Sequence, residues 1–216
     1  MGSIIDAREK LVSSLERFRY IKSNNVKKAF LTVDRSNFVP ESLKNEAYLD
    51  TPLPIGWGQT ISAPSMIAIM LEVSELSKGL KILEIGTGSG YNAALLAELC
   101  GEENVISIER IPEVFTFGKE NLERARYKVR IILGDGTKGY EEEAPYDRII
   151  VTAAAPQIPN SWKSQIKEKG MIIAPVGTER YYQELLVLRK KDGNFETKKH
   201  GGCVFVPLVG ENGWKE

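Results

Sequence analysis

The sequence contains almost no histidine or cysteine. Of its 216 residues, one is a histidine, His200, and two are cysteines, Cys100 and Cys203. Four Cys or His ligands for zinc are therefore not available, and we expect no metal in the site. Cys100 lies in the apolar run "AALLAELC", where it is most simply a small core residue. A disulfide is allowed by the count of two, but nothing in the pattern indicates one.

The chain also lacks a charge surplus and long apolar runs. Lysine and arginine together number 29, as do aspartate and glutamate. Binding to phosphates usually requires a basic surplus, so we expect no nucleic-acid partner. No apolar run approaches the roughly 18 residues of a membrane span, and the first ten residues do not resemble a signal peptide. These observations predict a cytoplasmic protein with no membrane partner.

From residue 80 onward, short apolar runs alternate with amphipathic segments. The predicted strands are 80–86, 105–110, 129–135, 147–156 and 171–177, and the predicted helices are 91–100, 112–125 and 160–169. Gly101 is placed to end the first of these helices and Pro112 to begin the second. The strands are apolar throughout, which is typical of parallel strands covered on both faces. The alternation predicts an α/β fold with a mostly parallel, doubly wound sheet.

The two ends of the chain have different patterns. Residues 6–21, 25–33 and 40–48 are predicted helices, and nothing in the first third indicates a strand. Residues 183–209 predict two strands around the turn "KKDGN", which would form an antiparallel edge on the parallel sheet, with His200 in a solvated turn before the last strand. We predict one domain over residues 1–216. Residues 1–78 would form a helical segment with the active-site loop, and residues 79–216 a Rossmann-like core with C-terminal substrate-binding strands.

The loop "LEIGTGSGY" joins the first predicted strand of the core to its helix. Gly86, Gly88 and Gly90 allow a tight turn and close approach of a ligand, and the helix offers unpaired N–H groups to an anion. The spacing is not the G-x-G-x-x-G of dinucleotide sites. Glu84, two residues before the first glycine, is suited to a cationic amino group. Since an amino acid carries both charges, the loop points to the methionine part of S-adenosylmethionine.

Two more carboxylates follow the next strands. Glu109 ends the second strand and is suited to both hydroxyls of a ribose, and Asp135 ends the third, where it could accept a hydrogen bond from an adenine amino group. The alternative is that Glu109 pairs with a surface lysine and Asp135 starts a turn. Three acidic residues at three successive strand ends make a stronger signal than the glycines alone.

The segment "TAAAP", residues 152–156, follows the fourth strand of the core. Amino-group methylases commonly carry Asn or Asp, two prolines and an aromatic residue there, and metal-dependent catechol-type enzymes need clustered Asp and Asn ligands. Neither pattern is present. This argues against both kinds of methylation.

Several longer stretches together carry a specific resemblance. They are "PLPIGWGQTISAPSMIAIMLE", "ILEIGTGSGY", "ISIERIPE", "GDGTKGY", "APYDRIIVTAAAPQIP", "GMIIAPVG", "QELLVL" and "FVPLVG". From about Ala29 to Gly210 the chain resembles the protein-L-isoaspartate O-methyltransferase family, most specifically in Gln59–Ser62 and "TAAAP". The resemblance implies a Rossmann-like class I methyltransferase that uses S-adenosylmethionine. It would esterify the free carboxylate of L-isoaspartyl residues in damaged proteins and peptides, with D-aspartyl residues left open, and the ester would then close to a succinimide and so begin repair.

The glycine loop, the strand ends and the resemblance together give the candidate site. Ser62 is the predicted active-site serine. The residues expected at the cofactor are Thr60, Ile61, Ala63, Glu84, Gly86, Thr87, Gly88, Ser89, Gly90, Glu109, Arg110, Asp135 and Gly136. Those expected at the substrate are Gln59, Ser62, Gln183, Val204, Phe205 and Val206.

Trp57 departs from the family pattern, since relatives often have histidine there. We expect it to be a packing residue that anchors its loop, in preference to stacking on the substrate. Two other functions stay open at this point: a non-catalytic module that binds S-adenosylmethionine, and a methylase of another small-molecule carboxylate.

Overall fold

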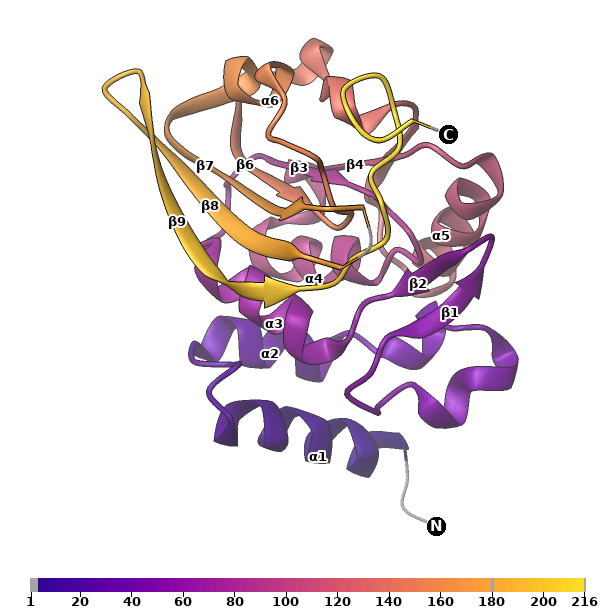
Figure 1. The fold of residues 1–216 in the computed structure, drawn as a ribbon. Helices are drawn as coiled ribbons and strands as arrows, with labels where there is room; N and C mark the ends of the chain where they lie inside the picture. The colour runs from indigo at the N-terminus through magenta and orange to yellow at the C-terminus, as the bar shows by residue number, and fades with distance from the viewer. Residues whose placement is uncertain (1–3, 180, 216) are drawn as a thin grey trace.

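A seven-stranded sheet forms the centre of the molecule, a computed structural model that describes residues 4–179 and 181–215 (Figure 1). The strands follow the order β5-β4-β3-β6-β7-β8-β9. They are β3 (Ile82–Ile85), β4 (Val105–Glu109), β5 (Arg130–Leu133), β6 (Tyr146–Val151), β7 (Ile166–Gly177), β8 (Gln183–Lys191) and β9 (Asn194–Cys203). The first five are parallel to one another, β8 is antiparallel to β7, and β9 is antiparallel to β8. The predicted fold class is confirmed.

Six α-helices lie in the described part of the chain. They are α1 (Ile4–Arg17), α2 (Asn24–Thr32), α3 (Pro64–Val73), α4 (Tyr91–Cys100), α5 (Pro112–Arg124) and α6 (Asn160–Gln165). Gly101 ends α4 with φ at 101° and its N–H bonded to the Ala97 carbonyl, while Pro112 is the first residue of α5. Both boundaries are as predicted, because glycine tolerates this φ and proline needs no N–H partner in a first turn.

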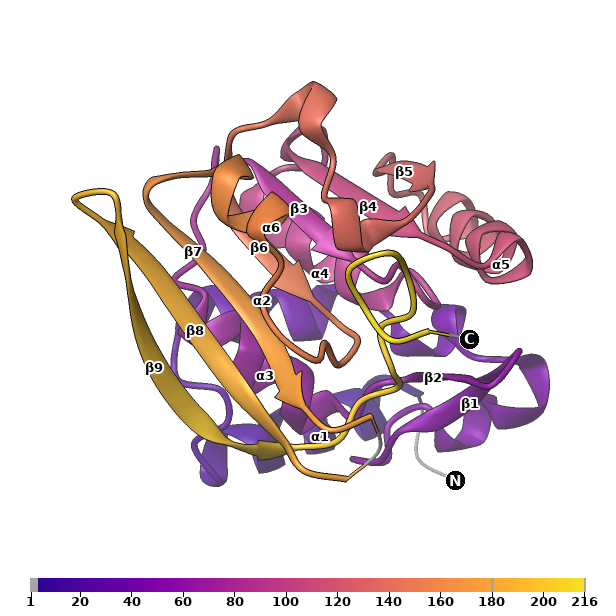
Figure 2. The same ribbon diagram turned by 45° about the horizontal axis from the view of Figure 1, so that its top comes forward.

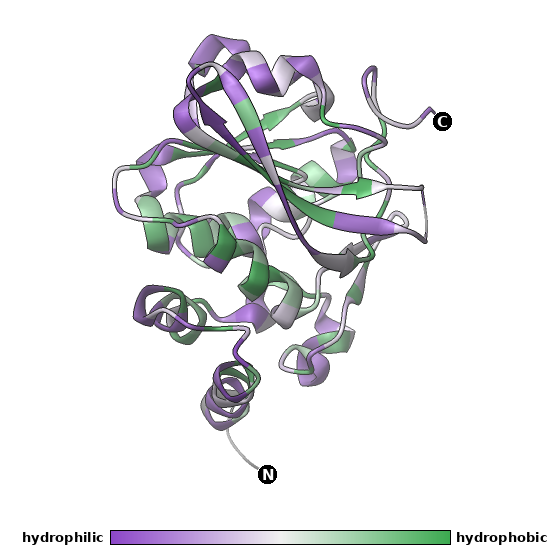
Figure 3. Cartoon of the chain, turned by 60° about the vertical axis from the view of Figure 1, so that its left-hand side comes forward, coloured by the Kyte–Doolittle hydropathy of each residue, from purple (hydrophilic) through white to green (hydrophobic). Residues whose placement is uncertain are grey.

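Helices cover both faces of the sheet. Neighbouring residues of β3 point to opposite faces of the sheet. Ile82 belongs to the apolar cluster that includes α3, α4 and α5, and Leu83 belongs to the cluster that includes Trp162 of α6. Figures 1 and 2 show α1 and α2 as an outer layer beyond α3 and α4. In Figure 3 the helices α3 and α4 are mainly hydrophobic and β9 is mainly hydrophilic.

One apolar cluster reaches from Leu11 to Phe205 and so includes residues from both predicted segments of the chain. The division at residue 78 stays a prediction. In the part of the chain described here, no helix has both the length and the apolar character needed to cross a membrane.

The first third of the chain contains a β-hairpin, so the prediction of no strand there was wrong. β1 (Leu53–Gly56) pairs antiparallel with β2 (Gln59–Ile61). The turn consists of Trp57 and Gly58, and the φ angles of Gly56, Trp57 and Gly58 are 98°, 50° and 70°. Three successive residues in the left-handed region reverse the chain, and they make the stretch "GWGQTIS" the tip and second strand of a hairpin.

Other boundaries also differ from the predictions. The segment 40–48 forms a 3-10 helix, η2 (Glu41–Glu46), in place of an α-helix. The helix predicted to reach residue 169 ends at Gln165, because Ile166 already pairs with the first residue of β6 and begins β7. β5 is a sheet edge and not covered on both faces, with Leu133 50% exposed. His200 lies within β9 and not in a turn, and β9 ends at Cys203, so residues 204–206 follow the strand.

Candidate active site

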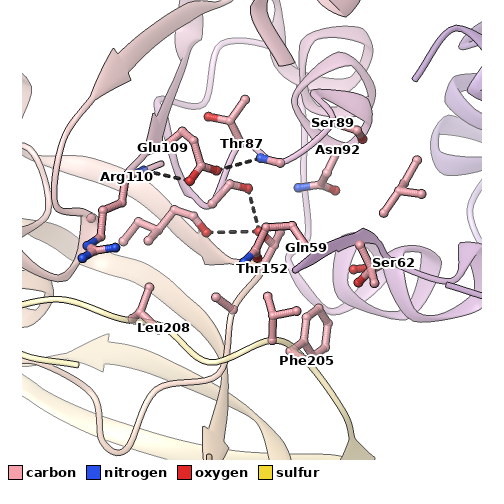
Figure 4. Close-up of a pocket in the computed structure, with 18 of the residues that line it drawn as sticks. Gln59, Ser62, Thr87, Ser89, Asn92, Glu109, Arg110, Thr152, Phe205 and Leu208 are labelled. Carbon is pink, nitrogen blue, oxygen red and sulfur yellow. Dashed lines mark hydrogen bonds between the residues drawn. The ribbon is translucent and has the colours of Figure 1, made fainter. Parts of the chain in front are cut away.

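The carboxyl ends of β3, β4 and β6 face a cavity that the β1–β2 hairpin and the C-terminal segment enclose from other sides (Figure 4). Most of the predicted site residues line it, namely Gln59, Thr60, Ile61, Ser62, Gly86, Thr87, Gly88, Ser89, Glu109, Arg110, Gly136, Phe205 and Val206. Ligand sites of open α/β sheets lie at this edge. The fold thus brings together segments that are more than a hundred residues apart.

A second cavity adjoins the first and is lined in part by exposed side chains. The two share one wall, made of Thr60, Ser62, Thr152, Phe205, Val206 and Pro207. Gln59 and Ile61 line only the first cavity, whereas Ala63 and Val204 line only the second. Gln59 was expected at the substrate and Ala63 at the cofactor, and both assignments stay predictions.

The glycine loop passes very close to the strand beside it. A Cβ atom at Gly86, whose φ is 95°, would lie 2.5 Å from the Thr152 Oγ1 atom. That hydroxyl donates a hydrogen bond to the Gly86 carbonyl at 2.7 Å. Thr152 lines both cavities, and sequence reasoning did not assign it a role, although it begins the distinctive "TAAAP" segment. Gly90 does not line the cavity but forms the left-handed cap of α4.

Glu84 lies beneath the loop and does not line the cavity. Its carboxylate accepts hydrogen bonds from Asn92 Nδ2 at 2.7 Å and from Ser107 Oγ at 2.5 Å. Burial raises the pKa of Glu84 to about 7, although these two hydrogen bonds act in the opposite direction. The predicted direct contact with an amino group is therefore not available, because both oxygens are bonded to protein groups below the surface.

Two cavity residues connect Glu84 with the space above it. Asn92 donates to Glu84 through its nitrogen, which leaves its amide oxygen for a ligand, and Thr87 is within 2.6 Å of the Ser107 hydroxyl that donates to Glu84. Both Asn92 and Thr87 line the cavity. Within the described ranges, Glu84 forms no ion pair, and a buried charge without a partner is unfavourable. A ligand ammonium above these acceptors would supply the missing charge.

Glu109 lines the cavity at the end of β4. One of its oxygens accepts the N–H groups of Arg110 and Ile111 at 2.8 and 3.0 Å, and the other accepts the Gly88 N–H at 3.0 Å. A carboxylate has about four acceptor positions, so one remains for a ligand hydroxyl. The contact of Glu109 with both ribose hydroxyls stays a prediction. The alternative that Glu109 pairs with a surface lysine has no support in these contacts, which are all with backbone N–H groups.

Asp135 also lies outside the cavity lining. Its carboxylate accepts hydrogen bonds from the Thr137 N–H and hydroxyl and from the Glu211 N–H, at 2.6 to 2.9 Å. Burial alone would raise the pKa of Asp135, but the bonds from Glu211 and Thr137 hold it below its ordinary value. The carboxylate thus caps the short helix η4 (Gly136–Lys138) and attaches the C-terminal segment. Gly136, next in sequence, does line the cavity, and the contact of Asp135 with adenine stays a prediction.

Ser62 follows β2 directly and lies on the wall shared by the two cavities. Among residues 4–179 and 181–215, no group forms a hydrogen bond with its hydroxyl, which is therefore available to a ligand. Phe205 and Val206 face the same wall from the C-terminal segment, and Val204 is 72% exposed at the rim of the second cavity.

Gln183 lines neither cavity, so its predicted contact with substrate is not supported by its position. It is 4% exposed, and its amide pairs with the backbone of Phe205. A buried amide must satisfy its hydrogen bonds, and here it does so within the protein. Gln183 thus holds the shape of the segment that forms the cavity wall.

Trp57 packs against Phe117 of α5, with ring centroids 6.0 Å apart, and lines neither cavity. The Trp57 side chain is 50% exposed; the contact with Phe117 agrees with a packing residue, and its preference over stacking on the substrate stays a prediction. His200 also lines neither cavity. Cys100 and Cys203 are both buried and free. No cluster of three His, Cys, Asp or Glu side chains suited to a metal occurs in the ranges that the structure covers.

These contacts fit S-adenosylmethionine. The acceptors above buried Glu84 suit an ammonium, the start of α4 suits a carboxylate, and Glu109 suits a ribose hydroxyl. The fold and the cavity thus define a class I methyltransferase that uses S-adenosylmethionine. The family model described as Protein-L-isoaspartate(D-aspartate) O-methyltransferase (PCMT) matches residues 6–213, and the chain belongs to that family.

Known proteins agree with this placement along nearly the whole chain. A protein-L-isoaspartate O-methyltransferase from Methanopyrus kandleri is 53% identical over 214 residues, which cover 97% of this chain and 94% of that protein. One from Pyrococcus horikoshii is 52% identical over 210 residues, 96% and 95% of the two chains.

Solved structures agree as well. One described as a protein-L-isoaspartate O-methyltransferase superposes with a TM-score of 0.86 at 34% identity, over 95% of this chain and 66% of that one. Another, from Plasmodium falciparum and in complex with S-adenosyl-L-homocysteine, gives a TM-score of 0.83 at 30% identity, over 94% and 98%.

Proposed function

We propose that this chain methylates the free carboxylate of L-isoaspartyl residues in damaged proteins and peptides, with S-adenosylmethionine as the donor. The observation that supports it most is the wall shared by the two cavities, which includes Ser62. A donor in the first cavity and a carboxylate in the second would meet at this wall. Val204, Phe205 and Val206 would contact the substrate from the C-terminal side.

The reaction requires no general base from the protein. A free carboxylate has a pKa near 4 and is ionised at neutral pH. When bound, S-adenosylmethionine supplies a methyl group on a sulfonium sulfur, which passes to a carboxylate oxygen while the C–S electron pair stays on sulfur. No proton has to move, which agrees with a cavity that contains no histidine. The protein contributes alignment, which can supply roughly 7–11 kcal/mol in favourable cases.

Ser62 is the residue that we assign to the substrate carboxylate. Its hydroxyl would donate one hydrogen bond and hold the attacking group in line. Such a bond to a charged group contributes about 1.5–3 kcal/mol. It also stabilises the charge that the reaction consumes, so a single donor from a neutral side chain is better suited than a cation.

The rim of the second cavity favours a polypeptide over a small molecule. Tyr181 and Val204, which line it, are 77% and 72% exposed. A small-molecule site usually encloses most of its ligand, whereas an exposed apolar rim suits an extended chain. The free cysteines support a cytoplasmic setting, and the zero net charge gives no reason to expect nucleic acid.

Transfer of a labelled methyl group tests the proposal. Two synthetic peptides of identical sequence, one with L-isoaspartate and one with L-aspartate, are incubated with the protein and labelled S-adenosylmethionine. We expect base-labile label only in the isoaspartyl peptide. Cofactor binding by calorimetry without transfer to either peptide would support the non-catalytic module, and equal labelling of both peptides would refute the substrate assignment.

A further inference from the structure

Arg35 is a buried arginine that binds the backbone around the active-site hairpin. It begins the short helix η1 (Arg35–Phe38) and is 0% exposed. Its three nitrogens donate to backbone carbonyls: Nε to Ala47 at 2.8 Å, one terminal nitrogen to Ser62 at 3.1 Å, and the other to Thr51 at 3.4 Å. Within the described ranges the guanidinium forms no ion pair, so it acts chiefly as a hydrogen-bond donor to the main chain.

Two of these carbonyls lie at the two ends of the hairpin. Thr51 precedes β1 and Ser62 follows β2, so one planar guanidinium joins the base of the hairpin across both strands. Arginine has five N–H donors in a rigid plane, which suits several acceptors at fixed angles. The hairpin carries Thr60, Ile61 and Ser62 to the cavities, and its own pairing covers few residues. The arginine therefore connects the chain before β1 with the chain after β2.

The other side of the guanidinium lies against the core of the sheet domain. The Arg35 Cζ atom is 5.3 Å from the ring centroid of Tyr91, which is 2% exposed and lines the cofactor cavity. Tyr91 is the first residue of α4 and packs against Phe30 and Phe38. The contact chain therefore runs from α4 through Tyr91 and Arg35 to the Ser62 carbonyl.

We propose that Arg35 is a positioning residue for methyl transfer, which fixes the Ser62 backbone relative to the cofactor cavity and thereby the position of the Ser62 hydroxyl. The proposal rests on the proposed role of Ser62. The serine hydroxyl has no other anchor in the described residues, so its position depends on its backbone. An error of about 1 Å in such a group can cost on the order of a hundredfold in rate.

Arg148 offers a matched control. It is also buried, 8% exposed, and donates to three backbone carbonyls, those of Ser74, Glu75 and Asp147. These lie at the start of β6 and after α3, away from both cavities. Arg148→Lys should therefore destabilise the fold as Arg35→Lys does, without a specific effect on transfer.

The experiment combines each arginine variant with Ser62→Ala and measures kcat with both substrates saturating, together with KM for the cofactor. We expect Arg35→Lys to lower kcat by about tenfold and by no more than Ser62→Ala does, with cofactor KM nearly unchanged. In the Ser62→Ala background the same change should cost less than about twofold, because the group that it positions is gone. Arg148→Lys should leave kcat within about twofold in both backgrounds.

Equal losses from Arg35→Lys in both backgrounds would overturn the proposal, as would an unchanged kcat or an equal loss from Arg148→Lys. If the lysine variant does not fold, Arg35→Gln keeps amide donors without burying a charge, and the same outcomes decide.

Hydrogen exchange of residues 52–63 with S-adenosylhomocysteine bound needs no activity. It should be faster in the Arg35 variant and unchanged in the Arg148 variant, and equal exchange would overturn the proposal. A wild-type protein inactive on isoaspartyl peptide would count against the proposed function alone.

Discussion

The side chain of Gln183 forms two hydrogen bonds with one backbone unit, that of Phe205. Its Nε2 atom donates to the carbonyl at 3.0 Å, and its Oε1 atom accepts the N–H at 2.6 Å. Gln183 is the first residue of β8, and Phe205 belongs to the wall between the two cavities. The end of the sheet thereby sets the position of the proposed substrate wall, although Gln183 itself contacts no cavity.

Gln183→Ala should weaken substrate binding without weakening cofactor binding. The change leaves a backbone N–H and a carbonyl unpaired, at about 1–3 kcal/mol for each group, and the Phe205 segment should lose its fixed shape. We expect KM for an isoaspartyl peptide to rise about tenfold, with the Kd of S-adenosylhomocysteine nearly unchanged.

Gln165→Ala is the control, since Gln165 is also buried and pairs with two backbone groups, those of Lys138 and Tyr140, away from both cavities. Calorimetry and steady-state rates on both variants decide. A rise in peptide KM for both variants would mean general destabilisation.

Ser62→Ala should reduce catalysis far more than cofactor binding. Loss of one hydrogen bond to a charged group, about 1.5–3 kcal/mol, corresponds to a roughly ten- to hundredfold lower rate. Ser65→Ala, three residues further on and outside both cavity linings, should have little effect. Lost S-adenosylmethionine binding with an otherwise normal rate would place Ser62 at the cofactor and refute the assignment.

Glu109→Ala should have the opposite effect. The carboxylate has one acceptor position left for a ligand hydroxyl, and a bond of about 1.5–3 kcal/mol implies a roughly ten- to hundredfold higher Kd for S-adenosylhomocysteine. Methyl transfer should be partly restored at high cofactor concentration.

The measurement requires a temperature at which the variant is folded, because Glu109 also accepts three backbone N–H groups. Glu113→Ala, an exposed glutamate in the first turn of α5, is the control. Unchanged cofactor affinity in Glu109→Ala would sink the ribose assignment.

Trp57→Ala should speed up release of the cofactor. Trp57 at the hairpin tip packs on Phe117 of α5, so it connects two elements whose neighbouring residues line the cofactor cavity. An aromatic pair of this kind contributes about 0.5–1.5 kcal/mol, which corresponds to a roughly two- to twelvefold higher dissociation rate constant. Phe117→Ala should give the same change, and the double variant no more than either. Additive effects in stopped-flow dissociation would show that the two rings act independently.

The sequence predicts the sheet well because its strands follow simple rules. Runs such as 80–86 are mainly apolar, with Lys81 and Glu84 as the exceptions, and a glycine or proline marks ends of the helices between the strands. The hairpin of "GWGQTIS" was not predicted, because its strands are only four and three residues long and its turn depends on three left-handed residues, one of them a tryptophan. Periodicity carries no signal over so few residues.

The site shows the same limit. Residues that act through type and spacing, such as Glu109 and the glycines, were found from the sequence. Arg35 and Thr152 were not, because their roles arise from backbone carbonyls that lie far away along the chain. For Glu84 the residue was found but its contact was wrong. The burial that separates it from the cavity depends on Ser107 and Asn92, which only the folded chain brings together.

The pH dependence of the methylation rate tests whether a titrating side chain of the protein takes part in catalysis. With both substrates saturating, we expect a nearly flat methylation rate from about pH 6 to 8, because a carboxylate with a pKa near 4 is already ionised. His200→Gln should give the same profile, since His200 lies on β9 away from both cavities, and burial, then Lys198 and Lys22, lowers its pKa. A tenfold step near pH 6.5 that disappears in His200→Gln would show that a base operates.

Cofactor affinity should instead depend on pH through Glu84. Burial raises its pKa to about 7 in the folded protein, so it is largely protonated at pH 6 and largely ionised at pH 7.5. The ionised form orients Asn92 and Thr87 as acceptors for a ligand ammonium.

If only the protein with ionised Glu84 binds well, the Kd of S-adenosylhomocysteine should fall about tenfold from pH 6 to 7.5. This range lies below that in which a free α-amino group loses its proton. Binding at pH 6 should release close to one proton, which calorimetry in buffers of different ionisation enthalpy measures. Glu84→Gln should abolish both the proton release and the pH dependence. Glu84 also lowers the free energy of unfolding as the pH rises from about 4.5 through 7, because its carboxyl group ionises at a lower pH in the unfolded chain than in the folded protein. The free wild-type protein should therefore lose more stability between pH 5 and pH 8 than Glu84→Gln does. A pH-independent Kd in the wild type would show that Glu84 does not act on the ligand through Asn92 and Thr87.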